Sequence, residues 1–126
     1  MSVLHERALT ERIIGLAINV HRALGPGLLE TAYEECLCFE LKSATIAFAR
    51  PQELPVTYRN VRLDCGYRVD IVVEQTVLLE LKAIERLAPI HDAQMLTYLR
   101  LSRMKVGLLM NFNAVLLKDG LRRFVM

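Results

Sequence analysis

One near-continuous apolar run, residues 106–112, constrains the fold of this chain more than any other feature of its sequence. A run of this kind is typical of a strand that is buried on both faces. Two further stretches, residues 67–73 and 77–83, are rich in Val, Ile and Leu and predict strong strands. We therefore expect a β-sheet with helices packed against it.

Two amphipathic helices are predicted ahead of the sheet. From about Leu4 to Leu24, apolar residues recur at steps of three and four, which indicates a helix with one inward face. The Gly-Pro-Gly sequence of residues 25–27 ends this helix, because Pro cannot continue a helix and Gly permits a sharp turn. A second helix, from about Leu28 to Ser43, should pack on the first as a hairpin or sharp corner. The inward-facing residues are expected to be Leu9, Ile13, Leu16, Ala17, Val20 and Leu24 in the first helix, and Leu29, Ala32, Tyr33, Cys36, Leu37 and Leu41 in the second.

The sequence changes character after the second helix. Residues 45–48 and 54–58 are rich in strand-forming types but are interrupted by Pro51 and Pro55. Proline is confined to edges and bends of sheets, so these segments predict bent or edge strands. Residues 61–63 are expected to extend the same sheet.

The last third of the chain predicts a helix and more strands. Residues 91–103 are expected to form a third helix after a proline break, and residues 115–117 and 121–125 a final hairpin around an Asp-Gly turn. The element order favours an α/β fold, a mixed β-sheet flanked by helices with an N-terminal helical pair. A length of 126 residues suits one domain, so residues 1–126 are expected to form a single domain.

Composition excludes several classes of protein. A net charge of +2 excludes a strongly basic nucleic-acid coat and an acidic disordered tail, but leaves room for a local basic groove. Cys36, Cys38 and Cys65 form no CxxC pair, so reduced thiols and no zinc site are expected. Residues 1–10 lack the apolar core of a signal peptide, and no apolar run reaches the roughly 18 residues of a membrane span. We expect a cytoplasmic protein with no membrane contact.

The residues that carry chemistry lie in the two central strands. Glu80 and Lys82 alternate along one strand and therefore share a face. Charged groups in so apolar a strand are unfavourable unless something satisfies them, and Asp70 in the preceding strand poses the same problem.

The length of the hairpin loop decides whether these groups meet. A two-residue loop would place Asp70 opposite Leu81, on the other side from Glu80. A three-residue loop would place Asp70 across from Glu80, and Arg68 across from Lys82. We predict an odd-length loop or a bulge, which brings Asp70, Glu80 and Lys82 together.

Two neighbouring carboxylates repel each other, and at least one rises in pKa unless a cation intervenes. A hard divalent cation such as Mg²⁺ prefers oxygen ligands and bridges readily to phosphate. Lys82 would then orient or help deprotonate a water, or offset negative charge in the transition state. The alternative is a surface salt-bridge ladder, since an E-x-K triplet alone is common.

The pattern of Asp70 followed by Glu80-Leu81-Lys82 resembles the D…(D/E)xK motif of the PD-(D/E)xK nuclease superfamily, with Val69 in place of the Pro. Residues 27–33 are similar to the GxxExxY motif, from which a family of small prokaryotic proteins takes its name. The resemblance extends from about residue 13 to residue 124. Further segments that look like that family are residues 21–27, 91–94 and 107–112.

This resemblance implies a restriction-endonuclease-like fold and a metal-dependent nuclease that hydrolyses phosphodiester bonds of DNA or RNA, with Mg²⁺ or Mn²⁺ as cofactor. The implied catalytic residues are Asp70, Glu80 and Lys82. The implied metal ligands are Glu30, Asp70, Glu80 and Leu81. For Glu30 the alternative is that it only complements the positive end of its helix dipole.

Substrate-binding residues are also implied. Gln94 and Tyr98 form a QxxxY pair, similar to that of recombination-type exonucleases, and at i and i+4 they share one helical face with His91. Arg68 could contact phosphate if it shares the face of Asp70. The alternatives are that Tyr98 is a half-buried aromatic, that Gln94 caps a backbone group, and that His91 only helps to start the helix.

Two other functions fit the sequence. A nuclease-like scaffold could bind nucleic acid or a partner protein without cutting, and a chain this short is compatible with a homodimer or a partner protein. The acidic residues could also serve folding alone.

Overall fold

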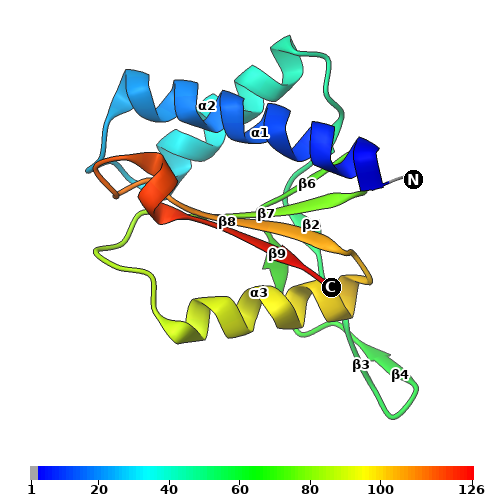
Figure 1. Cartoon of the computed structure of the whole chain (residues 1–126). Coiled ribbons are helices and arrows are strands. Elements are labelled where there is room, and N and C mark those ends of the chain that lie inside the picture. The colour runs from blue at the N-terminus through cyan, green and yellow to red at the C-terminus, as the bar shows by residue number, and fades with distance from the viewer. Residues whose placement is uncertain (1–2) are drawn as a thin grey trace.

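The computed structural model describes the backbone of residues 3–126 and the side chains of residues 6–126. Residues 1 and 2, part of the segment expected to carry no signal peptide, lie outside this range. The predicted helical pair is confirmed as α1, Val3–Leu24, and α2, Glu30–Ser43, which lie together over one face of the sheet (Figure 1). Within the described residues, no helix combines the length and the apolarity that a bilayer crossing needs.

The inward faces of these helices agree with the predicted spacing in most positions. Among the described side chains, the buried apolar residues are Leu9, Ile13, Ala17 and Val20 in α1, and Tyr33, Leu37, Cys38 and Leu41 in α2. The prediction that Leu29 faces inward was wrong, since Leu29 precedes the first helical turn and is 79% exposed. Leu24, at the last residue of α1, is also exposed.

The sheet is mixed, as predicted. Its five strands follow the order β1-β6-β7-β8-β9, with β7 and β8 parallel and the other pairs antiparallel. The strands are β1 Phe48–Ala49, β6 Ile71–Val73, β7 Val77–Lys82, β8 Val106–Asn111 and β9 Leu121–Val125. Parallel neighbours need a crossover, and α3, Pro89–Ser102, supplies it on the face opposite α1 and α2 (Figure 1).

Burial on both faces of the central strands follows from this layering. Leu79 and Leu81 of β7 join the core under α1 and α2, whereas Leu78 joins the core under α3. All six residues of β8 are buried, as the apolar run predicted. Gly107 allows α3 to approach closely, because a Cβ at this position would lie 2.5 Å from the Met95 sulfur.

Two regions differ from the prediction in their pairing. The strand expected over residues 67–73 is split at Asp70 into β5, Arg68–Val69, and β6. β5 pairs with β2, Gln52–Glu53, in a separate two-stranded sheet. β3, Val56–Tyr58, and β4, Val61–Leu63, form a second two-stranded sheet, an arm that projects from the body (Figure 1).

The strand predicted over residues 121–125 is confirmed as β9, but its predicted hairpin partner, residues 115–117, is not a strand. The chain turns directly after β8, where the Ala114 N–H donates to the Asn111 carbonyl and the Asn113 N–H to the Asn111 side chain. A short 3₁₀ helix, Leu117–Gly120, follows, and β9 then runs back antiparallel to β8. In this way β9 pairs with the edge of β8. A hairpin between residues 115–117 and 121–125 would have left that edge unpaired.

Candidate active site

Asp70 and Glu80 lie opposite each other where β6 and β7 separate. The register pairs Val73 with Val77, so residues 74–76 form a three-residue loop. The predicted odd-length loop is therefore confirmed. The ladder ends with Ile71 opposite Leu79, and the next position along each strand places Asp70 across from Glu80.

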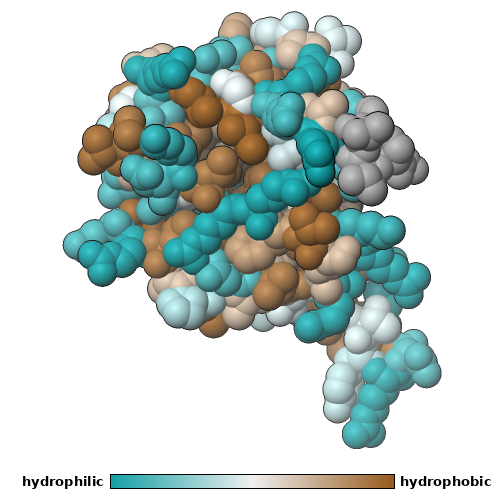
Figure 2. All heavy atoms as spheres, viewed as in Figure 1, coloured by the Kyte–Doolittle hydropathy of each residue, from teal (hydrophilic) through white to brown (hydrophobic). Residues whose placement is uncertain are grey.

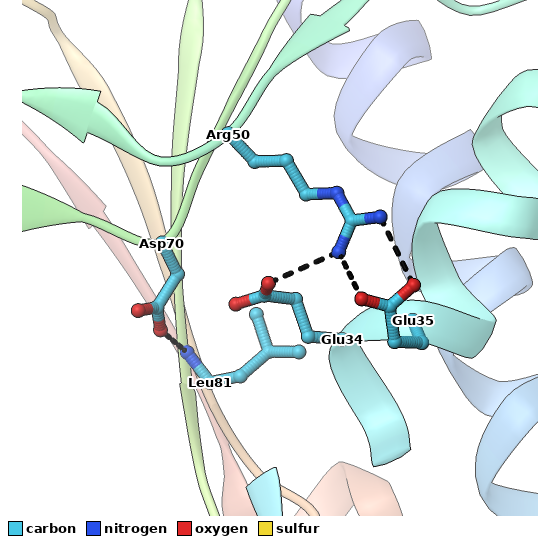
Figure 3. A network of polar contacts seen from close by, with 5 residues as sticks. All are labelled: Glu34, Glu35, Arg50, Asp70 and Leu81. Atoms are coloured by element: carbon cyan, nitrogen blue, oxygen red, sulfur yellow. Dashed lines mark hydrogen bonds and ion pairs between the residues drawn. The ribbon is translucent and has the colours of Figure 1, made fainter. Parts of the chain in front are cut away.

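The two carboxylates replace backbone carbonyls as hydrogen-bond acceptors at this point. The Asp70 N–H donates to Glu80 Oε1 at 3.2 Å, and the Leu81 N–H donates to Asp70 Oδ2 at 2.8 Å. Because the side chains take over these bonds, the strands separate here, which explains the break at Asp70. Figure 3 shows the bond between the Leu81 N–H and Asp70. In the part of the chain that the structure describes, the second oxygens, Asp70 Oδ1 and Glu80 Oε2, have no hydrogen-bond partner.

Burial makes this pair electrostatically unfavourable in its charged form. Burial, as the largest cause, and the neighbouring Asp70 charge, as the second, raise the pKa of Glu80 to about 8. Burial also raises the pKa of Asp70, against the hydrogen bond from the Leu81 N–H. The Lys82 charge lowers both pKa values. The pair would therefore hold a proton near neutral pH unless a cation binds to it.

Lys82 lies two residues beyond Glu80 on β7 and is partly buried. Strand alternation places Glu80 and Lys82 on the same side as Leu78, under α3. Among residues 6–126, no ion pair within 4.0 Å joins Lys82 to a carboxylate. Lys82 is therefore not part of a surface salt-bridge ladder among the described residues, and its ammonium can interact with a bound ligand.

Sequence reasoning missed an ion-pair network beside Asp70. Arg50 donates to both oxygens of Glu35, at 2.8 and 3.0 Å, and to Glu34 at 3.2 Å. Figure 3 shows Glu34 between Arg50 on one side and Asp70 with Leu81 on the other. The Glu34 charge raises the pKa of Asp70. The only sequence signal for Glu34 is its position one turn after Glu30, and no local pattern points to Arg50.

Glu30 is the first residue of α2 and is exposed. Its charge raises the pKa values of Asp70 and Glu80, and it lines a shallow cavity with Ala83, the residue after β7. Across the described residues, no three His, Cys, Asp or Glu side chains gather closely enough to hold a metal. Glu30 is therefore near the carboxylate pair without completing a three-carboxylate cluster.

Tyr33, the last residue of the GxxExxY-like segment, fixes the loop that leads into α2. Its hydroxyl donates to the Gly25 carbonyl at 2.7 Å and accepts from the Leu28 N–H at 3.1 Å. Its ring stacks on Phe112, with centroids 4.7 Å apart. The Gly27 N–H donates to the Asn113 side chain, which ties the same loop to the end of β8. This loop in turn sets the position at which α2 begins.

Replacement of Tyr33 by phenylalanine should destabilise the fold by about 1–2 kcal/mol, since the Leu28 N–H and the Gly25 carbonyl each lose a partner while the stacked ring remains. Urea unfolding of the purified variant measures this. Tyr58→Phe is the matched control, because the Tyr58 side chain is 59% exposed. Equal losses in the two variants would mean that the Tyr33 hydroxyl does not fix the loop.

The predicted substrate-binding residues separate into two groups. Gln94 is exposed and Tyr98 is half-buried, and both line one groove along α3. Burial, followed by the charge of Glu80, raises the pKa of Tyr98. His91 Nδ1 accepts a hydrogen bond from the Ala88 N–H at 2.8 Å at the start of α3. This contact agrees with the alternative in which His91 helps to start the helix.

The predicted pairing of Arg68 with Lys82 was wrong. The ladder between β6 and β7 ends at Ile71, and β5 pairs with β2 instead. The Arg68 guanidinium lies 4.0 Å from Glu53.

A mixed sheet with helices on both faces, and with two carboxylates and a lysine on adjoining strands, defines a nuclease-like α/β protein with the restriction-endonuclease-like fold. A comparison with known families matches residues 7–124 to the PD-(D/E)XK nuclease superfamily, and the chain belongs to that superfamily. No curated protein and no solved structure matched the chain.

Proposed function

We propose that this protein is a metal-dependent nuclease that hydrolyses phosphodiester bonds of DNA or RNA. We also propose that residues 1–126 act as one domain and belong, within the superfamily, to the small prokaryotic proteins with the GxxExxY motif. The observation that carries the proposal is the carboxylate pair: buried Glu80 lies beside half-buried Asp70, and within the described residues each keeps one oxygen without a protein hydrogen-bond partner.

The donor set fits a divalent cation. Mg²⁺ and Mn²⁺ favour oxygen ligands, and Asp70 Oδ1 and Glu80 Oε2 are the two free carboxylate oxygens. The N–H and C=O of a strand residue leave on the same side, so the carbonyl of Leu81, whose N–H binds Asp70, faces Asp70 as well. The Lys82 carbonyl leaves on the other side and accepts the Phe112 N–H. Glu30 could approach from the start of α2.

In the reaction, Asp70 and Glu80 would hold the cation, with Leu81 as a further oxygen ligand. When bound, the cation would polarise a phosphoryl oxygen and make a nearby water more acidic. Lys82 presents its ammonium from the same face as Glu80, where it would stabilise the negative charge that develops on the phosphate or orient the attacking water. The hydrogen bonds from the Asp70 and Leu81 N–H groups keep both carboxylates oriented.

The test is cleavage of labelled DNA and RNA with Mn²⁺ or Mg²⁺. We expect cleavage that stops when EDTA is added and that is lost in Asp70→Asn, a variant whose side-chain oxygen can still accept the Leu81 N–H. Metal-independent cleavage, or full activity in Asp70→Asn, would contradict the proposal.

One observation favours a second function, a non-catalytic module that binds nucleic acid or a partner protein. Across residues 6–126 no three-ligand cluster is formed. Calorimetric titration with Mn²⁺ separates the two functions. Binding that disappears in Asp70→Asn supports the nuclease, and a folded protein that takes up no Mn²⁺ supports the module.

A further inference from the structure

A groove runs along α3 beside the proposed active site. Gln94, Thr97 and Tyr98 form its helical wall, and Val56 of the projecting arm and Tyr67 lie opposite. Its volume is about 400 Å³. One wall is thus a single helix, and the other is a strand of the arm with the segment that leads into β5.

The two tyrosines connect this groove to the carboxylates. Tyr67 lies three residues before Asp70 on the same segment, and its side chain is 51% exposed. Tyr98 lies on α3, which packs on the face of the sheet that carries Leu78 and Glu80. The groove, which Tyr67 and Tyr98 line, therefore lies on the same side of the sheet as the site proposed to cut phosphodiesters.

The charge of this part of the molecule suits a phosphate backbone. Arg100 lines the groove, and Arg59 and Arg62 lie on the arm, which Figure 2 shows at the lower right as a largely hydrophilic projection.

We propose that this groove binds one unpaired strand of nucleic acid, with a base stacked on the exposed ring of Tyr67 and the adjoining phosphate directed toward Asp70 and Glu80. Exposed aromatic rings bind single strands by stacking on unpaired bases, whereas the bases of a duplex already stack on one another. Gln94 and Thr97 supply hydrogen-bonding groups on the facing wall, and Arg100 contacts the backbone. The inference rests on the proposed nuclease function and assigns its substrate class, single-stranded rather than duplex nucleic acid.

The experiment measures binding without cleavage. Fluorescence anisotropy in EDTA compares a labelled oligothymidylate of about 20 nucleotides with a blunt duplex of the same length. We expect the single strand to bind at least about 10-fold more tightly. Tyr67→Ala should weaken single-strand binding about 10-fold or more, and Tyr67→Phe should bind as the wild type does. Arg100→Ala should reduce the slope of log affinity against log salt by about 0.7.

Phe39→Ala is the matched control. Phe39 is an aromatic residue of similar character, 70% exposed on α2, in the layer on the opposite face of the sheet. Its removal should leave single-strand binding unchanged.

The outcomes distinguish this inference from the function on which it rests. Preference for the duplex, or equal binding by Tyr67→Ala and wild type, overturns the proposal that the groove binds a single strand, even if Mn²⁺-dependent cleavage is found. Loss of binding in Tyr67→Ala supports the groove even if no cleavage is found, in which case the nuclease proposal fails alone. Absence of any binding to the single strand also overturns the groove.

Discussion

Lys82→Ala is expected to lower the rate of phosphodiester cleavage by about 100- to 10,000-fold. The ammonium lies on the same face as Glu80, partly buried, where few water molecules can screen or replace it. Within the described residues it forms no ion pair that would give it a structural task. Its loss should therefore act on the reaction more than on folding. The measurement is the cleavage rate with saturating Mn²⁺.

Lys118→Ala is the control for this variant, because Lys118 is exposed on the 3₁₀ helix and should be dispensable. Lys82 carries no ligand atom in the proposed site, so Lys82→Ala should still bind Mn²⁺ by calorimetry, whereas Asp70→Asn should not. Cleavage that persists in purified Lys82→Ala would point to another site or to a contaminating nuclease.

Glu80→Gln is expected to be more stable than the wild type at pH 8 in EDTA, by about 2–5 kcal/mol. The pKa of Glu80 rises from 4.5 to about 8 on folding, so the folded protein binds more protons than the unfolded chain between these values. The free energy of unfolding of the wild type therefore falls as the pH rises from about 4.5 to about 8. Glutamine has no such titration, and its carbonyl oxygen can still accept the Asp70 N–H.

Urea unfolding from pH 5 to 9 tests this, with Glu85→Gln as a matched control at an exposed position. The two proteins should differ little near pH 5 and diverge toward pH 8. Mn²⁺ should narrow the difference, because a cation at 100 times its dissociation constant stabilises a folded protein by about 2.7 kcal/mol. Parallel pH profiles for wild type and Glu80→Gln would show that Glu80 is not destabilised by burial.

The sequence allowed the central part of the site to be predicted. Side chains alternate strictly along a strand, so the parity of the loop at residues 74–76 decided whether Asp70 could meet Glu80, and the structure has the odd length. The helical pair and the buried strand β8 were also predictable, because their apolar spacing is local and covers many residues.

Other features depend on contacts between distant segments, which spacing does not encode. Arg50 meets Glu34 and Glu35 across some fifteen positions in the chain. The split of the predicted strand at Asp70 arises because side chains replaced the backbone in the ladder. The pairing of β9 with β8 depended on an edge that the rest of the sheet left open.

The two hydrogen bonds from backbone N–H groups to the carboxylates have a consequence for ion selectivity in the proposed metal site. One oxygen of each acid is tethered to the main chain, so the spacing of the remaining oxygens is set by the rigid sheet rather than by freely rotating side chains. Mg²⁺ binds oxygen at about 2.0–2.1 Å and Ca²⁺ at about 2.3–2.6 Å, and Ca²⁺ needs more ligands in a more flexible shell. In the proposed metal site, a preorganised pair of this kind would therefore discriminate between ions by their radius.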